Sequence, residues 1–447
     1  MKIYVIKNGL DIGYLTQSEE NRKVSFIYLP DRDYILQGLK SKENTSDTLF
    51  PIFENLLPEH QYLDIIKARY SIKLEIETLL YLEDIHGSFE FYTEEDYQGK
   101  SFSEIPKLIF NECKNEILNN NYVFPNILND YNLKIGEDIL YPEELKHSKL
   151  IGISGFQYKF SIELDSQNKT IEYDATKNSE YFMKPYSEYY TLHDPLDRSR
   201  SYIPFLLINE HIFMTIARDL GFDIPYNAII KGKDDYHYII KRYDRHKESR
   251  IDHHELLTLL EKKSDQKYKV TMQEVLLNTK SYITQNELYQ LFKFIVYSVI
   301  IAHGDLHAKN LSLIFQTNDL YETKMQLAPL YDISTTAIYQ ELHSRNCGMK
   351  IKNKTSKINT DDLLWLCEKL ELDKKKSIEI IDEVACYFLD NFLQYIDKLP
   401  PEIKTLKFKR KRYGFDTLEA TFDRFYNKRC RYINDYLDID TTQDIFD

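Results

Sequence analysis

The strongest pattern of hydrophobic positions in the chain predicts a buried helix over residues 287–302. Gly304 is expected to end this helix. The polar segment 303–312 follows directly, so its side chains should stand on a loop held by a rigid buried element. The apolar positions recur at helical spacing and form a stripe wide enough for a core helix: Leu288, Leu291, Phe292, Ile295, Val296, Val299 and Ile300.

Shorter patterns predict strands on both sides of this helix. Residues 1–30 contain three short β-branched or alternating runs, and Asn8-Gly9 is a hairpin turn signal between the first two. Two more hairpins are predicted over residues 226–241 and 311–330, the second of them behind the polar segment. The chain therefore begins strand-rich and ends mostly helical, and the fold class that we predict is α+β.

Three further regions have helical patterns. Residues 61–82 are predicted to be helical, and residues 205–220 form an amphipathic helical pattern for which Gly221 is a stop signal. Residues from about 360 to 440 are predicted to be helical as well. The region from about 86 to 148 is polar and aromatic with no clear period, and no motif can be placed in it.

Composition narrows the class of protein. The chain has 447 residues, which favours two or three lobes, and a formal net charge of −13, which argues against direct binding of nucleic acid by the whole chain. No apolar run resembles a signal peptide or approaches membrane-spanning length. A reducing cytoplasm is expected, because the five cysteines are spread out without metal-ligand spacing: Cys113, Cys347, Cys367, Cys386 and Cys430.

The polar segment carries the residue types of a phosphoryl-transfer site. Asp305 is followed five positions later by Asn310, and Asp332 comes after a further apolar run. In kinases one Asp accepts the proton of the acceptor hydroxyl, while an Asn and a second Asp hold the metal that bridges the phosphates of ATP. Oxygen ligands of this kind suit Mg²⁺. The pattern predicts a kinase.

Other parts of a nucleotide pocket are weaker signals. Residues 150–162 could place backbone N–H groups and Lys159 on phosphates, although Gly-Ile-Ser-Gly is also an ordinary hairpin turn. Lys184 closes an apolar strand and Glu210 lies near the start of the following helix, which is the arrangement that fixes ATP phosphates in kinases. The alternatives are an exposed strand end and a solvated helix face. Residues 241–245 would be the hinge between lobes.

Taken together, these segments resemble the HipA family of serine/threonine kinase toxins of bacterial toxin–antitoxin modules. The resemblance is carried by several motifs in the family's order: Phe53–His60, Ile153–Lys159, Phe182–Pro185, Asn209–Glu210, Lys241–Arg245, His303–Asn310 and Ala328–Ile333. Lys309 stands four positions after Asp305, where ordinary protein kinases have their lysine two positions after the base. The His-Gly-Asp-x-His-x-x-Asn pattern of small-molecule kinases is matched as well, and this keeps a second reading open.

The resemblance implies a role for each matching residue. Asp305 would be the general base, and Asn310 and Asp332 would bind Mg²⁺. Lys184 would hold the ATP phosphates, and Lys241–Tyr243 would carry adenine by backbone contacts. The full implied ATP-binding set is Ser154, Gly155, Phe156, Gln157, Tyr158, Lys159, Lys184, Lys241, Arg242, Tyr243, His307, Lys309, Asn310, Tyr331 and Asp332.

The chain departs from the family pattern at several positions. Some members phosphorylate a serine of the phosphate loop that falls on Gly152 here, so Ser154 is the candidate autophosphorylation site. The family's hinge Glu and Phe are replaced by Lys241 and Tyr243, which backbone contacts tolerate. His253-His254 stands where the family often has Gln-Glu. A metal there is not expected, since adjacent side chains point in different directions.

The expected architecture is a two-lobed, protein-kinase-like fold with a β-rich N-terminal subdomain and an all-α C-terminal lobe. The predicted divisions are 1–148, the N-terminal subdomain with a poorly assigned connection; 149–245, the nucleotide-binding part; and 246–447, the catalytic loop and helical lobe. The basic run 404–412 is interpreted as a solvated face.

The resemblance implies an ATP- and Mg²⁺-dependent kinase that phosphorylates a translation protein, such as an aminoacyl-tRNA synthetase, and arrests growth. A small helix-turn-helix antitoxin of the HipB type would bind it and link it indirectly to operator DNA, without membrane association. Two alternatives remain: a small-molecule phosphotransferase, and a catalytically inert, antitoxin-bound co-repressor. The motif at Phe53–His60 favours the toxin, because it has no role in the first alternative.

Overall fold

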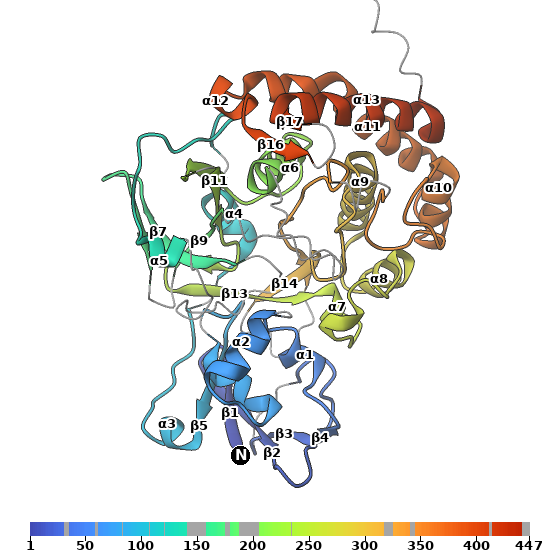
Figure 1. Cartoon of the computed structure of the whole chain (residues 1–447). Coiled ribbons are helices and arrows are strands. Elements are labelled where there is room, and N and C mark those ends of the chain that lie inside the picture. The colour runs from blue at the N-terminus through green and yellow to red at the C-terminus, as the bar shows by residue number, and fades with distance from the viewer. Residues whose placement is uncertain are drawn as a thin grey trace, which may run out of the picture.

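A computed structural model gives the fold (Figure 1). It describes residues 1–30, 35–58, 61–82, 84–106, 108–119, 121–140, 158–174, 179–186, 205–233, 235–316, 325–339, 345–410 and 414–439. Among these residues no helix combines the length and the apolar character needed to cross a membrane.

The N-terminal part is an antiparallel five-stranded sheet in the order β4-β3-β2-β1-β5, which confirms the three predicted strands. Asn8 and Gly9 both have positive φ, as the tight turn between β1 and β2 requires. Two short helices and a 3₁₀ helix pack on this sheet around Phe26 and Phe53. The elements are β1 (Lys2–Lys7), β2 (Leu10–Gln17), β3 (Val24–Tyr28), β4 (Glu43–Ser46), α1 (Pro51–Glu54), α2 (Gln61–Arg69), η1 (Glu75–Tyr81) and β5 (Phe89–Thr93).

The prediction of one continuous helix over residues 61–82 is wrong. Ser71 has a left-handed backbone (φ 51°), so α2 ends at Arg69 and a separate 3₁₀ helix begins at Glu75. A residue of this conformation cannot continue a right-handed helix.

A second, six-stranded sheet has the order β10-β11-β9-β7-β8-β6. Helix α6 (Leu206–Asp219) was predicted, and Gly221 (φ 89°) ends it as expected. The predicted hairpin at 226–241 is also present. The strands are β6 (Asn132–Lys134), β7 (Phe160–Asp165), β8 (Thr170–Tyr173), β9 (Tyr181–Lys184), β10 (Asn227–Lys231) and β11 (Tyr236–Lys241), with α3 (Glu94–Gln98), α4 (Phe110–Leu118) and α5 (Glu137–Leu140) on the connections.

A four-stranded sheet lies between the first two sheets and the helices, in the order β12-β13-β14-β15 (Figure 1). It contains the predicted hairpin behind the polar segment, now seen as β14 paired with β15. Its strands are β12 (Arg245–His246), β13 (Ser249–Glu255), β14 (Ser312–Gln316) and β15 (Gln326–Leu327), and α7 (Leu256–Leu259) continues directly from β13.

The remaining chain is mostly helical and packs around the predicted central helix, α9. Thr284 and Glu287 form a capping box that begins α9. The helix elements are η2 (Ser264–Gln266), α8 (Met272–Thr279), α9 (Gln285–Ile301), α10 (Thr360–Lys369), α11 (Lys374–Lys398), α12 (Pro401–Lys404) and α13 (Leu418–Leu437).

The end of α9 differs from the prediction. Ala302, and not Gly304, has the left-handed conformation (φ 55°) that closes the helix. Gly304 is needed for another reason: a Cβ atom there would lie 2.4 Å from Thr336 Oγ1. The glycine thus permits the close approach of the segment after Asp332 to the polar loop.

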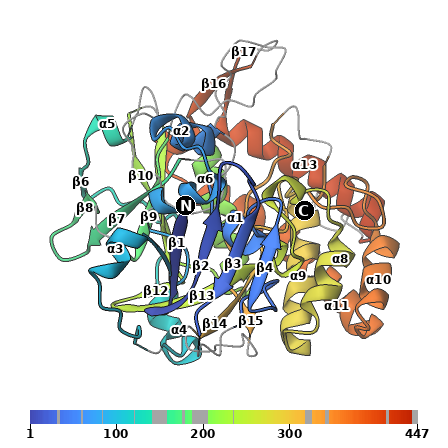
Figure 2. The ribbon, with the colours of Figure 1, turned by 90° about the horizontal axis from the view of Figure 1, so that it is seen from below.

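The prediction of an all-α C-terminal lobe was incomplete. The lobe contains the four-stranded sheet, and the basic run enters a two-stranded hairpin of β16 (Lys407–Arg410) and β17 (Gly414–Thr417) that projects from the helices (Figure 2). β16 pairs antiparallel with β17, and Thr417 then caps the start of α13.

Candidate active site

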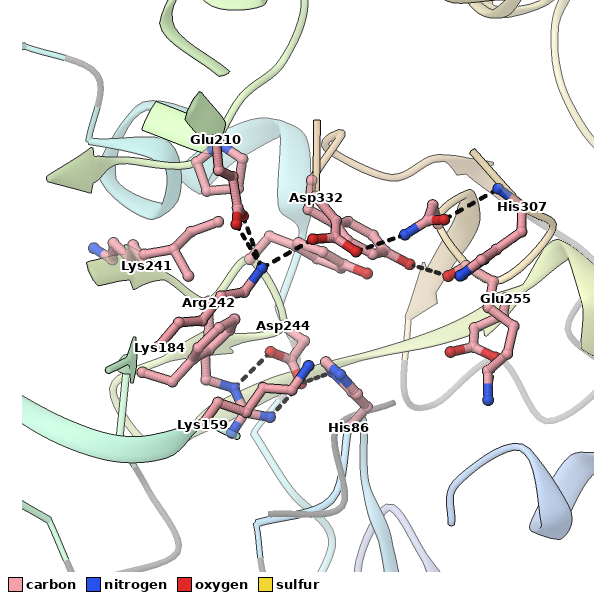
Figure 3. A pocket seen from close by; sticks show the side chains of 17 residues that line it. His86, Lys159, Lys184, Glu210, Lys241, Arg242, Asp244, Glu255, His307 and Asp332 are labelled. Carbon is pink, nitrogen blue, oxygen red and sulfur yellow. Dashed lines mark hydrogen bonds and ion pairs between the residues drawn. The ribbon is translucent and has the colours of Figure 1, made fainter. Parts of the chain in front are cut away.

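A pocket lies where the six-stranded sheet, the four-stranded sheet and the loop after α9 meet (Figure 3). Most of its lining comes from segments that the sequence analysis singled out. The lining residues are His86, Lys159, Phe182, Lys184, Glu210, Pro225, Ile240, Lys241, Arg242, Tyr243, Asp244, Glu255, His307, Lys309, Asn310, Tyr331 and Asp332.

Lys184, at the end of β9, connects both sides of the pocket. Its Nζ atom donates to both carboxylate oxygens of Glu210 at 2.8 Å and to Asp332 Oδ1 at 2.9 Å. The predicted contact between this strand lysine and the helix glutamate is therefore present. Strand pairing places Lys184 opposite Tyr238 of β11, and α6 supplies Glu210 from behind the sheet. One ammonium group thus forms ion pairs with two carboxylates.

The charges of this triad are coupled. Burial raises the pKa of Glu210 to about 7, because Lys184 offsets only part of the desolvation and Asp332 adds repulsion. Burial acts in the same sense on Asp332, but Lys184 outweighs it and holds the pKa of this half-exposed carboxyl well below its usual range. At neutral pH Glu210 is therefore partly protonated, while Asp332 stays ionised.

Asp332 and Asn310 face each other across the pocket and offer oxygen atoms of the type that Mg²⁺ prefers. Asn310 Nδ2 donates to Asp332 Oδ2 at 2.8 Å, and its Oδ1 accepts from the backbone N–H of His307 at 3.1 Å. Asp332 has a left-handed backbone (φ 59°), a strained conformation of the kind that recurs at functional sites. The donor set fits a divalent cation, provided that Asp332 exchanges Lys184 for it and the Asn310 amide turns its oxygen inward.

Asp305 lies at the open edge of the same loop. Its side chain is exposed, and its Oδ1 accepts a hydrogen bond from the hydroxyl of Tyr268. The Tyr268 ring stands edge-on to His307, with ring centroids 5.1 Å apart. Tyr268 was not recognised in the sequence, since no motif surrounds it.

Lys309 is buried beneath the pocket and points toward the N-terminal subdomain. Its Nζ atom donates to Ser264 Oγ at 2.9 Å and to the backbone oxygen of Asn55 at 3.3 Å, and lies 3.6 Å from Glu255. The side chain was expected near the phosphates. It lines the pocket, but its ammonium group ties the loop to the motif that begins at Phe53.

The predicted hinge residues line the pocket, but their side chains point to different parts of the molecule. Lys241 Nζ donates to the backbone oxygen of Glu116 at 2.8 Å, outside the pocket. The Tyr243 ring stacks on Tyr331, with centroids 5.9 Å apart. The backbone N–H groups of Lys241 and Arg242 already donate to the backbone oxygens of Tyr226 at 2.8 Å and Glu180 at 2.7 Å, so the backbone contact of the hinge to adenine stays a prediction.

Arg242 instead belongs to a buried ion-pair network with the N-terminal subdomain. Its guanidinium lies 2.6 Å from Asp84 and 2.9 Å from Asp244, and Arg245 reaches Asp244 at 2.8 Å. His86 from the same subdomain lies 3.6 Å from Asp244, and burial lowers the pKa of its imidazole. Sequence reasoning missed Asp84 and His86, which lie in or beside the region where no period was found.

The histidine pair of β13 behaves as an alternating strand predicts. His254 packs on Phe315, whereas His253 joins His86 and Asp244, whose ligand atoms lie within 4.8 Å of one another. Asp244 Oδ2 already accepts from both arginines. A cation at this position would have to displace both arginine guanidinium groups from Asp244. We therefore keep the expectation that the histidine pair does not bind a metal.

The phosphate-loop candidates are only partly visible. Ser154, Gly155, Phe156 and Gln157 lie outside the described residues. Tyr158 is buried in the core of the six-stranded sheet, and Lys159 lines the pocket with its Nζ atom 5.8 Å from the centre of the Phe182 ring.

Comparison with known proteins gives consistent matches. The family model described as the HipA-like C-terminal domain matches residues 151–392. A Haemophilus influenzae protein named "Putative kinase" is 27% identical over 210 residues, which cover 43% of this chain and 54% of that protein. The "Putative kinase Y4dM" of Sinorhizobium fredii is 26% identical over 191 residues, covering 40% and 46%. The chain thus spans about half the length of these relatives.

Among solved structures, the fold is similar to Shewanella oneidensis HipA in its complex with HipB and operator DNA. The TM-score is 0.65 at 14% identity, and the match covers 97% of each chain. This likeness confirms the predicted two-lobed, kinase-like α+β fold.

Proposed function

The chain belongs to the HipA-like C-terminal domain family, and from this premise we propose that it is an ATP- and Mg²⁺-dependent serine/threonine protein kinase. The observation that carries the proposal is Lys184, which contacts both Glu210 and Asp332 in one pocket. A lysine on a strand, a glutamate on the next helix and a metal-type aspartate are the parts that position ATP in kinases.

Each side chain has a distinct task in this proposal. Lys184, held by Glu210, binds the nucleotide phosphates. Asn310 and Asp332 hold Mg²⁺, which neutralises charge on the phosphates when bound. Asp305 accepts the proton of the acceptor hydroxyl. The backbone of Lys241–Tyr243 binds adenine.

We propose further that the chain is the toxin of a toxin–antitoxin pair. The likeness in fold to a HipA bound to HipB and DNA supports a small helix-turn-helix antitoxin as its partner. The formal charge of −13 makes contact with DNA through the antitoxin more favourable than contact by this chain. The substrate is a protein of translation, with aminoacyl-tRNA synthetases as the family precedent.

Expression in bacteria tests this function. The wild-type chain is expected to arrest growth and to add phosphate to seryl or threonyl residues of a translation protein, detected by phosphoproteomics. Asp305→Ala is expected to do neither, and co-expression of the small neighbouring reading frame should restore growth. Equal arrest by the wild type and Asp305→Ala would contradict a kinase mechanism and favour an inert, antitoxin-bound co-repressor.

The small-molecule phosphotransferase remains the second candidate, because the loop matches that pattern too. It predicts ATP turnover with a metabolite and no new phosphoprotein. The docking of Asn55 on Lys309 speaks against it, since the N-terminal subdomain contacts the catalytic loop directly.

A further inference from the structure

Tyr268 occupies the position at Asp305 where a phosphoryl acceptor belongs. Its hydroxyl donates to Asp305 Oδ1. A general base of this kind must hydrogen-bond to the hydroxyl that it deprotonates. The phenol of the chain itself therefore makes the contact that an acceptor substrate would make.

The contact is supported by the surrounding chain. Tyr268 follows η2, and this segment runs along the catalytic loop: Ser264 binds Lys309, and the backbone oxygen of Lys267 accepts from the N–H of Ala308 at 3.5 Å. The ring stands edge-on to His307. The anchors at Ser264 and Lys267, just before Tyr268 in the chain, thus hold the segment from which the Tyr268 hydroxyl reaches Asp305.

The side chain is nevertheless accessible. Its exposure is 40%, and the Nζ atom of the buried Lys267 lies 5.3 Å from the ring centre. A tyrosyl side chain is longer than a seryl side chain. Tyr268 uses this extra length to reach Asp305 from a neighbouring segment of the chain.

We propose that Tyr268 is an intramolecular phosphoryl acceptor, modified by the chain's own active site. The inference rests on the proposed kinase function. Tyr268 Oη attacks the γ-phosphorus of ATP, an Oη–P bond forms, the bond from phosphorus to the bridging oxygen breaks, ADP leaves, and the phenolic proton passes to Asp305. The phosphate then repels the carboxylate, so the modified side chain leaves the base open to other acceptors.

The test is incubation of the full chain with Mg²⁺ and ATP, followed by peptide mapping for phosphotyrosine and a parallel assay of ADP. We expect phosphate on Tyr268, formed with a first-order rate constant that does not depend on protein concentration. Tyr268→Phe keeps the ring and removes only the acceptor oxygen, so it should lose this phosphate. Tyr282→Phe, a matched change at a half-buried tyrosine away from the pocket, should keep it.

Three results would overturn the proposal, and they separate its failure from the failure of the proposed function. ADP formation or phosphorylation of other sites without phosphate on Tyr268 would refute this inference and leave the kinase intact. No ADP and no phosphate with the wild type would refute both. A first-order rate constant that rises with protein concentration would refute the intramolecular step. Urea unfolding of Tyr268→Phe checks that the variant is folded.

Discussion

At the scale of single residues, the site is held together by one ammonium group with two carboxylates. Lys184 lies 2.8 Å from Glu210 and 2.9 Å from Asp332, so the triad carries a formal charge of −1 when both acids are ionised. This arrangement keeps the pocket nearly neutral without ligand. It also means that a cation and a polyphosphate can enter together, the cation on Asp332 and the phosphates on Lys184.

Nucleotide affinity should depend on pH through Glu210. Burial raises the pKa of Glu210 to about 7, and the charge of Asp332 adds to this effect. Once a cation neutralises Asp332, Glu210 should ionise, so binding of Mg²⁺·ATP releases a proton. Affinity is then expected to fall about tenfold per pH unit below 7 and to stay constant above it.

Calorimetry between about pH 5.5 and 8, in buffers of different ionisation enthalpy, measures this proton release. Glu210→Gln cannot titrate and should abolish the slope. A slope that persists in Glu210→Gln would assign the titration to another group.

Mg²⁺ alone should bind more tightly when Lys184 is removed. The ammonium competes with the cation for Asp332 at a half-exposed position, where an ion pair contributes about 1 kcal/mol. Lys184→Met is therefore expected to raise Mg²⁺ affinity about five- to tenfold while lowering ATP affinity. Unchanged Mg²⁺ affinity in this variant, measured by calorimetry without nucleotide, would show that Asp332 is not a metal ligand.

At the scale of elements, the N-terminal subdomain supports both sides of the active site. Asn55, just after α1, donates to Thr258 Oγ1 and to the backbone oxygen of Lys262 at 2.9 Å, and its own backbone oxygen accepts from Lys309. The short motif at Phe53 therefore couples a distant sheet to the catalytic loop.

Asn55→Ala should weaken this coupling. It removes the three hydrogen bonds of a buried side chain, to Thr258, Lys262 and Ser264, and leaves partners unsatisfied, at a cost of about 1–3 kcal/mol in the free energy of unfolding. Urea unfolding measures the cost, and a lower phosphoryl-transfer rate is expected at unchanged ATP affinity. Asn44→Ala, in strand β4 of the same subdomain, removes only two exposed hydrogen bonds to the Ser41 backbone; it is the control and should change stability much less and leave the transfer rate unchanged.

Arg242 is the corresponding support at the hinge. Arg242→Met leaves Asp84 and Asp244 with an unbalanced buried charge, and breaking a buried pair in this way costs about 3–5 kcal/mol. Lys23→Met, which removes an exposed ion pair with Asp47, should cost less than about 1 kcal/mol. Equal unfolding midpoints in urea for the two variants would contradict the structural role given to Arg242.

Local signals accounted for the elements and for the pocket residues that lie within motifs. The periodicity of α9, the stop at Gly221 and the hairpins were predictable because each depends on neighbours in sequence. Tyr268, His86 and Asp84 were not, since they come to the site through contacts between segments far apart in the chain. The left-handed Ala302 was missed because a glycine two positions later offered the commoner helix end.

At the scale of the whole molecule, the six-stranded sheet, the four-stranded sheet and the loop after α9 meet at one pocket, which His86 of the N-terminal subdomain also lines (Figures 1 and 3). The six-stranded sheet supplies Lys184, and the loops around the four-stranded sheet supply Asp305, Asn310 and Asp332. The N-terminal subdomain contacts both the hinge and the catalytic loop. The molecule is therefore expected to act as one unit, in which the first 90 residues contribute to catalysis without providing its base.

The central claim is that this pocket transfers the γ-phosphoryl group of ATP with Asp305 as the base. The most direct measurement is incubation of the purified chain with γ-labelled ATP and Mg²⁺, alongside Asp305→Ala, with calorimetry to confirm that both bind Mg²⁺·ATP. The account predicts label on protein with the wild type and a rate lower by about 10²- to 10⁴-fold with Asp305→Ala. Equal labelling by the two proteins would contradict it.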